Sequence, residues 1–578
     1  MVKTATLNGR AISRSWLPPL DGGTALMAVL IAFMGFYVLY PLALILINSF
    51  NTATIAEPPV YGLKAWREAF GEYGIWRSLW NSIKIGIVLQ VVALPLGIFI
   101  SWLLARTNIL FPSALEFGFW ISFFLPGLAT TFGWMLMLDP STGLINSWLR
   151  QVPLLGSLNF DIYSFWGIIW VHLVGNGIST KVMLMTPAFR RMDASMEEAS
   201  RMSGGSAFTT LVRITVPAMT PVIIVVLLLS VIRIFSSFEI ELLLGVPWSF
   251  YVYSTKIVDL ARQGPALVNQ ARALGSVILV FLVAFIPLQR KLISRRQFTT
   301  VTGHFKPKII DLGVWRYPAT AFVALVIFIL DVVPLLSVLG GSFMTRFGFF
   351  NLPKTWTLEY WNMALSDARI VQGLHNTLIV AVSAGLVGAL VFSLIGYVLV
   401  RTKLPGRSVL DSICWLPSAI PGVLSGLGLL WMFLGTPFFR PFYGTIVLLV
   451  IAQVLGGVTL STQILKANFV QLGKELEESS RMSGAGFWRT YFRIVFPLMA
   501  QTMVLVGVIK FMFAAQHNSA IILLATSETR TLSLLALDQV AAGYREVASI
   551  TIIMVTLLTL GVAIVARSFG LKVGIRAE

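Results

Sequence analysis

Two nearly identical polar octets mark a chain that is otherwise strongly apolar. Residues 197–204 read EEASRMSG, and residues 477–484 read EESSRMSG. Each octet joins two adjacent carboxylates to an arginine and ends in a glycine. These residue types suit ion pairing and hydrogen bonding with another macromolecule. A partner with two equivalent subunits would explain why the octet occurs twice.

Some ionisable residues lie within apolar segments, where a charge is costly and often functional. Five of them are candidates for a functional role: Arg233, Glu239, Glu241, Lys510 and His517. Arg233 and Glu241 are eight residues apart, a little over two helical turns, so one continuous helix would place them on the same face. Two interpretations stay open: the five side chains serve a functional site, or they pair between helices and reach toward a membrane interface.

No cluster in the sequence indicates a metal site or an enzyme active site. The four histidines, at positions 172, 304, 375 and 517, and the single cysteine lack the spacing of metal ligands. One cysteine also excludes an internal disulfide, and apolar neighbours make Cys414 a packing residue. We therefore predict that the chain binds no metal or cofactor and catalyses no reaction.

The segments that position these residues are predicted membrane helices. Of 578 residues, 57% are hydrophobic and 12% are charged, and the mean hydropathy is +0.83; ordinary globular proteins are about 45–50% apolar and about 25% charged. An apolar run of about 20 residues can cross the hydrocarbon core of a bilayer. The composition predicts an all-α integral membrane protein. Twelve spans are expected, at 24–47, 81–105, 115–138, 163–186, 218–244, 271–289, 318–340, 376–400, 409–434, 443–466, 498–524 and 546–567.

Basic residues set the predicted orientation. With an even number of spans both termini share one side, and the segments on that side hold roughly twice as many Lys and Arg residues as those opposite, which marks it as cytoplasmic. The net charge of +18 is spread over many short loops, so it favours anionic lipid over nucleic acid as a partner. The first apolar run is too long for a signal peptide and no cleavage pattern follows it, so we keep it as a span.

The two sets of six spans are internal copies. Matching residues are displaced by 295 positions through the third span and by 280 positions further on, so the connection after the third span is shorter in the second copy. We expect Asn81 and Asn376 to cap the outer ends of equivalent helices. Because both copies have the same orientation, we predict parallel repeats about a pseudo-twofold axis along the membrane normal, with a pathway at their interface. The matched pairs are Asn81 and Asn376, Arg106 and Arg401, Pro126 and Pro421, Gly204 and Gly484, and Pro217 and Pro497.

The octets belong to loops 190–217 and 467–497. In each loop good helix formers precede a glycine, a second short segment follows, and a proline opens the next span. The alternative, a helix lying among lipid headgroups, fits poorly because adjacent carboxylates would face an anionic leaflet. The predicted parts of the chain are a cytoplasmic tail at 1–23, the first repeat at 24–289, a basic cytoplasmic linker at 290–317, the second repeat at 318–567 and a second cytoplasmic tail at 568–578.

These two loops resemble the signature loop of the permease subunits of binding-protein-dependent ABC importers, Glu-Ala-Ala-x3-Gly-x9-Ile-x-Leu-Pro. Serine replaces alanine in places, and valine or phenylalanine replaces leucine, which preserves small size and apolarity. The resemblance covers essentially the whole chain, because each copy holds a six-span core. The matching residues are Glu198-Ala199-Ser200-x3-Gly204-x9-Ile214-x-Val216-Pro217 and Glu478-Ser479-Ser480-x3-Gly484-x9-Ile494-x-Phe496-Pro497.

The resemblance implies a type I importer permease, in which each loop forms a coupling helix that lodges in a cleft of one ATPase subunit. Two ATPase copies would bind on the cytoplasmic side, carry ATP and Mg²⁺, and drive the halves between inward-open and outward-open states. The chain has no G-x-x-x-x-G-K-[ST] loop of its own. A soluble binding protein would deliver the solute to the outer side of a bacterial inner membrane. The residues that the resemblance assigns to coupling are Glu197, Glu198, Ala199, Arg201, Gly204, Pro217, Glu477, Glu478, Ser479, Arg481, Gly484 and Pro497.

In this family the fifth span of each half lines the pathway, so the resemblance makes the five ionisable residues Arg233, Glu239, Glu241, Lys510 and His517 candidates to face it. The fused two-half layout resembles the ferric-iron branch most, with thiamine, aminoethylphosphonate and polyamine permeases as alternatives. A secondary transporter driven by an ion gradient also uses twelve spans in two parallel halves, but it has no use for paired coupling loops. We predict an ATP-driven importer permease for a small solute, with ferric iron as the first candidate.

Overall fold

The computed structural model shows a helical membrane protein. Eight helices are long and apolar enough to cross a membrane, and three bent helix pairs bring the described residues to as many as 11 spans. The predicted all-α, multi-pass fold is confirmed. The sixth predicted span, 271–289, lies partly outside the described residues, and so do most of the linker 290–317 and most of the two tails. The structure describes residues 22–53, 58–71, 73–190, 192, 195–263, 269–281, 284 and 309–568.

The first repeat contains long spans interrupted by short helices and by π-helical turns, which are labelled η here. Its elements are α1 (Gly22–Asn48), α2 (Lys64–Gly71), α3 (Tyr73–Arg106), α4 (Pro112–Phe124), α5 (Gly127–Leu138), α6 (Leu144–Leu149), α7 (Phe165–His172), η1 (Leu173–Gly177), α8 (Ile178–Arg190), α9 (Ser195–Met202), α10 (Ala207–Thr210), η2 (Leu211–Thr215), α11 (Val216–Ser236), α12 (Glu239–Leu244) and α13 (Tyr253–Arg262).

The second repeat follows the same plan. Its elements are α15 (Arg316–Ile327), η5 (Phe328–Val332), α16 (Val333–Ser342), α17 (Glu359–Ser366), α18 (Ala368–Arg401), α19 (Arg407–Trp415), α20 (Gly422–Gly435), α21 (Ile446–Gly456), α22 (Val458–Gln471), α23 (Glu475–Met482), α24 (Phe487–Thr490), η8 (Tyr491–Val495), α25 (Phe496–Gln516), α26 (Leu532–Ala541) and α27 (Arg545–Ser568).

The third span of each repeat is sharply bent. The axes of α4 and α5 meet at 95°, and those of α19 and α20 at 112°. The bends fall at the matched prolines Pro126 and Pro421. A residue before proline is pushed out of the helical region, and Leu125 and Ile420 accordingly have ψ angles of 130° and 121°. The repeated proline therefore gives both halves the same bend.

The fifth spans end earlier than the sequence predicted. α11 stops at Ser236 because Ser237 is extended, with ψ 133°, and Phe238 also leaves the helical region, with φ −147°, before α12 begins. In the second repeat α25 stops at Gln516, and His517 is extended. The prediction that Arg233 and Glu241 share a face of one helix is therefore wrong, because the helix between them is broken.

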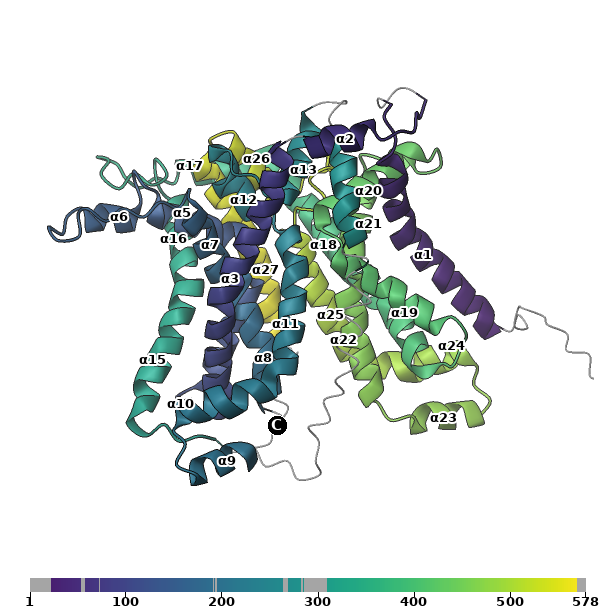
Figure 1. Ribbon diagram of the computed structural model, residues 1–578. Helices are drawn as coiled ribbons and strands as arrows, with labels where there is room; N and C mark the ends of the chain where they lie inside the picture. The colour runs from purple at the N-terminus through teal and green to yellow at the C-terminus, as the bar shows by residue number, and fades with distance from the viewer. Residues whose placement is uncertain are drawn as a thin grey trace, which may run out of the picture.

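The first span of each repeat packs on the other repeat. Figure 1 shows α1 beside α19 and α20, whereas α15 lies at the opposite edge, where it packs on α4 and its continuation α16 packs on α5. Matched glycines permit both crossings: a Cβ on Gly133 would lie 2.5 Å from Pro334 Cα, and a Cβ on Gly428 would lie 2.8 Å from Pro41 O. Small residues let helix backbones approach closely in membranes. The exchange ties the two repeats into one body.

The chain enters the exchanged α15 along the end of α3. Thr107 and Ile310 form a parallel bridge, and Ile310 N donates to Arg106 O at 2.7 Å. Asn108 Oδ1 then accepts from Leu312 N at 2.9 Å. These bonds fix the start of the second repeat against the first.

We expect Gly133→Ala to lower the free energy of unfolding by about 1–3 kcal/mol, because the added methyl group overlaps the backbone of α16. Gly340→Ala in α16 is the matched control. No atom lies within 4 Å of its Cβ position, so this helix should gain up to about 1 kcal/mol. Heat-induced loss of monodisperse protein in detergent measures the stability of both variants. Identical melting temperatures of the two variants would show that α5 and α16 do not pack closely at Gly133.

Candidate functional site

Both octets form short helices at the same end of the molecule. Figure 1 shows α9 and α23 below the bundle, whereas α2, α13 and α26 lie at the opposite end. Each helix is closed by a glycine in the left-handed region, Gly204 with φ +82° and Gly484 with φ +79°. Neither glycine has an atom within 4 Å of its Cβ position, so backbone conformation and not crowding requires glycine there. The predicted helix, glycine turn and second segment are present in both halves.

A buried ion pair attaches α9 to the end of α3. Arg106 Nη2 lies 2.5 Å from Glu197 Oε2, and their side chains are 1% and 4% exposed. Thr215 Oγ1 donates to Glu197 Oε1 at 2.8 Å, and Arg106 Nη1 donates to Met192 O at 3.1 Å. The first carboxylate of the octet thus points into the protein and holds the loop.

The second half repeats the attachment with the matched residues. Arg401 Nε lies 3.1 Å from Glu477 Oε1, as an ion pair without hydrogen-bond geometry. Tyr397 OH donates to Glu477 Oε2 at 3.2 Å, and Arg401 Nη2 donates to Leu472 O at 2.5 Å. We call these two attachments, Arg106 with Glu197 and Arg401 with Glu477, the arginine clamps. Sequence comparison matched the arginines but did not indicate their partners.

A hydrogen bond between two hydroxyl groups links each octet to the segment that follows it. Ser200 Oγ lies 2.9 Å from Thr210 Oγ1, and Ser480 Oγ lies 3.0 Å from Thr490 Oγ1. Together with the arginine clamps, these bonds make each loop a rigid extension of two spans.

The remaining octet residues leave apolar and polar groups on the surface. Met202 and Met482 are 85% and 88% exposed, and Phe208 and Trp488 are 70% and 50% exposed. Large exposed apolar groups beside polar ones are typical of a protein interface. Ala199, Glu478, Ser479 and Arg481 are also exposed, Glu198 is half-buried, Pro217 and Pro497 lie in the first turns of α11 and α25, and the side chain of Arg201 lies outside the described residues.

The ionisable pathway candidates of the first half do not pair with one another. Arg233 Nη1 donates to Thr180 Oγ1 at 3.2 Å. Glu241 is fully buried and lies 2.8 Å from His172 Nε2, and Ser237 Oγ donates to its carboxylate at 2.6 Å. His172 was missed as a functional candidate because its partner is far away in sequence.

The broken fifth spans meet across the two halves. Asn518 N donates to Glu239 Oε1 at 3.0 Å, and Gln516 Nε2 donates to Phe124 O at 2.9 Å. Phe123 and Phe513 pack edge to face nearby, with ring centroids 5.8 Å apart. Glu239 is thus the candidate that joins the repeats, at the point where both helices end.

The candidates of the second half point toward the span before them. Lys510 is buried and its Nζ donates to Gln453 O at 2.7 Å. Gln453 Nε2 donates in turn to His517 O at 2.8 Å. Lys181 lies buried within the fourth span, in α8.

The matched asparagines do not cap their own helices, as the sequence had suggested. Asn81 and Asn376 lie inside α3 and α18. Asn81 Nδ2 donates to Tyr251 O at 2.9 Å, and Asn376 Nδ2 donates to Arg530 O at 2.9 Å. Each asparagine therefore fixes the loop segment that leads into α13 or α26.

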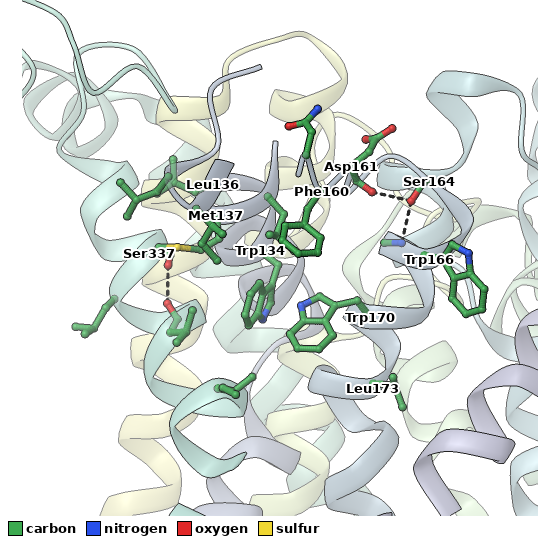
Figure 2. Close-up of a pocket in the computed structure, with 18 of the residues that line it drawn as sticks. Trp134, Leu136, Met137, Phe160, Asp161, Ser164, Trp166, Trp170, Leu173 and Ser337 are labelled. Carbon is green, nitrogen blue, oxygen red and sulfur yellow. Dashed lines mark hydrogen bonds between the residues drawn. The ribbon is translucent and has the colours of Figure 1, made fainter. Parts of the chain in front are cut away.

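An apolar groove of about 1230 Å³ lies away from these residues. Figure 2 shows it between α5, α7 and α16, with Trp134, Trp166, Trp170 and Ser337 on its walls. None of the five pathway candidates lines it. The groove therefore lies between the first repeat and the exchanged η5 and α16, apart from the contact of Glu239 with Asn518.

Comparison with known proteins agrees with this geometry. Residues 385–574, which include the second octet and its clamp, match the family of binding-protein-dependent transport system inner membrane components. The chain is a permease of a binding-protein-dependent ABC importer. A putative ferric transport system permease of Haemophilus influenzae is 26% identical to this permease, over 88% of it and 78% of the relative. A ferric transport system permease of Actinobacillus pleuropneumoniae is 27% identical, over 91% of this permease and 75% of the relative.

Among solved structures, a bacterial alginate ABC transporter in complex with alginate pentasaccharide-bound periplasmic protein aligns with the permease at a TM-score of 0.38 and 18% identity, over 45% of the permease and 96% of that chain.

We expect Glu197→Ala to destabilise the permease by about 3–5 kcal/mol, because it leaves the buried Arg106 without a counter-charge. The matched control is Glu478→Ala, whose side chain is exposed and which should change stability by less than about 0.5 kcal/mol. Thermal denaturation in detergent and the rate of tryptic cleavage near α9 measure the effect. Equal behaviour of the two variants would contradict the anchoring role of Glu197.

Proposed function

We propose that the permease carries ferric iron inward and is driven by two ATPase subunits that bind α9 and α23. The observation that carries the proposal is the pair of clamped loops at one end of the molecule. Each loop presents exposed methionine and aromatic side chains beside polar ones, and each is fixed to the spans by a buried charge. Two equal docking sites suit two equal partners.

The contacts of each loop suggest how force reaches the membrane. A push on α9 acts on α3 through Arg106 and on α11 through the continuous segment α10–η2. A push on α23 acts on α18 and α25 in the same way. α11 and α25 end where Glu239 meets Asn518. Movement of the loops would therefore open or close the contact between the repeats at the opposite end.

The same account gives an orientation. ATP and Mg²⁺ would be held by the partner ATPases in the cytoplasm, so the end with α9 and α23 would face inward and both termini would be cytoplasmic. The soluble binding protein would dock at the end that holds α2, α13 and α26. The membrane would be the inner membrane of a bacterium.

Two of the similar proteins support ferric iron as the solute. Both ferric transport permeases align along about nine-tenths of this permease. Thiamine, aminoethylphosphonate and polyamine stay as alternatives for the same transport role. A secondary transporter would leave the paired loops without a purpose.

We expect the double variant Gly204→Asp with Gly484→Asp to insert normally and to lose ATP-driven uptake, because a charged side chain at each turn disturbs the docking surface. Gly313→Asp is the matched control: this glycine also has positive φ and open space at its Cβ position, but it precedes α15 and lies outside the loops. Uptake of radioactive iron into proteoliposomes that contain the permease, its ATPase and its binding protein measures the effect. Wild-type uptake by the double variant would rule out the coupling role.

A further inference from the structure

The apolar groove between α5, α7 and α16 opens on the membrane-facing surface of the protein. One of its walls belongs to the span Gly313–Ser342. On this span Phe328 and Leu336 line the groove and are 49% and 60% exposed. Large apolar side chains that are exposed on a membrane span are in contact with lipid. The groove is therefore continuous with the surface that contacts the bilayer.

The lining of the groove changes from polar to apolar along its length. Figure 2 shows Asp161 and Ser164 at one end, Trp134 and Trp170 next to them, and Leu173 at the other end. The two tryptophans pack edge to face, with ring centroids 4.9 Å apart. Tryptophan is enriched in membranes at the level of the lipid head groups. The groove thus presents polar, aromatic and aliphatic groups in the order that suits the head group, glycerol and acyl chain of a phospholipid.

The fold itself does not require this lining, because the second repeat has different residues at the matched positions. Leu429 corresponds to Trp134, and Val450 corresponds to Trp170. The polar end, which includes Asp161, comes from the connection between the third and fourth spans, and this connection is longer in the first repeat than in the second. Helix packing alone therefore does not explain why tryptophans and a carboxylate gather here.

The charges at the polar end favour a zwitterionic head group. Asp161 is exposed, and it is the one charged residue among the described residues that line the groove. Its Oδ1 accepts from Tyr163 N at 2.8 Å. Trp356 lines both the groove and a smaller hollow that contains Lys354. A head-group ammonium would pair with Asp161 and a phosphate with Lys354, whereas Asp161 would repel a head group of net negative charge.

We propose that the groove binds one phosphatidylethanolamine molecule, with an acyl chain beside Trp134 and Trp170 and the head group at Asp161. Bulk lipid is as apolar as the groove, so van der Waals packing and the head-group charges, rather than hydrophobic transfer, would give the preference. The lipid would contact α5 and α7 of the first repeat together with η5 and α16 of the second. It would therefore stabilise the packing of the exchanged span, whichever solute the permease carries.

Filling the groove tests whether a lipid occupies it. Gly340 lines the groove, and no atom lies within 4 Å of its Cβ position, so Gly340→Phe introduces a ring without a clash at the backbone. Gly561→Phe is the matched control, because Gly561 also has open space at its Cβ position and does not line the groove.

Native mass spectrometry of the full permease, purified in mild detergent with added phosphatidylethanolamine, counts the bound lipids. We expect the wild type and Gly561→Phe to retain one phosphatidylethanolamine molecule more than Gly340→Phe. Equal retention by all three proteins would overturn the proposal. A bound polypeptide in place of the lipid would also overturn it.

The melting temperature of the delipidated permease in detergent tests the choice of head group. We expect phosphatidylethanolamine to raise the melting temperature of the wild type by about 2–4 °C, and phosphatidylglycerol to raise it by less. Asp161→Asn should abolish the difference between the two lipids. Glu359→Gln, which removes an exposed carboxylate of α17 outside the groove, should preserve it. Equal stabilisation of the wild type by both lipids, or by neither, would overturn the proposal.

Discussion

The buried arginine clamps are the interaction on which the rest of the structure depends. A short helix attached to the bundle only through its backbone would move independently of the membrane helices under load. A carboxylate buried without a partner would destabilise the fold. Pairing Glu197 with Arg106 removes that cost and fixes α9 to the end of a span of 34 residues. Glu477 and Arg401 do the same for α23. A load on either loop is therefore passed to the membrane helices.

The exchanged first spans determine what such a load can move. Because α1 packs on the second repeat and α15–η5–α16 on the first, neither repeat can separate as an independent bundle. The close crossings at Gly133 and Gly428 resist sliding of the exchanged spans. The broken fifth spans meet at Glu239 and Asn518. We propose that opening and closing are concentrated at this contact between the repeats.

Patterns that depend on local chemistry could be predicted from the sequence. The octets predicted both short helices, their glycine turns and their shared end of the molecule, since all of these follow from local residue types. The repeated proline pairs were recognised, but the bends they cause were not. The break at Phe238 has no proline or glycine beside it. The prediction from hydropathy therefore extended the fifth span past the break, to residue 244. The partners of Arg106 and Glu241 lie on distant segments, which one sequence does not place.

Distance measurement between the two loops tests the central claim most directly. Spin labels would replace Met202 and Met482, which are exposed at the ends of α9 and α23, in a chain whose buried Cys414 is changed to alanine. Electron paramagnetic resonance would then compare the complete transporter with and without Mg·ATP. The account predicts that ATP shortens the distance between the labels. An unchanged distance in a complex that binds ATP would contradict it.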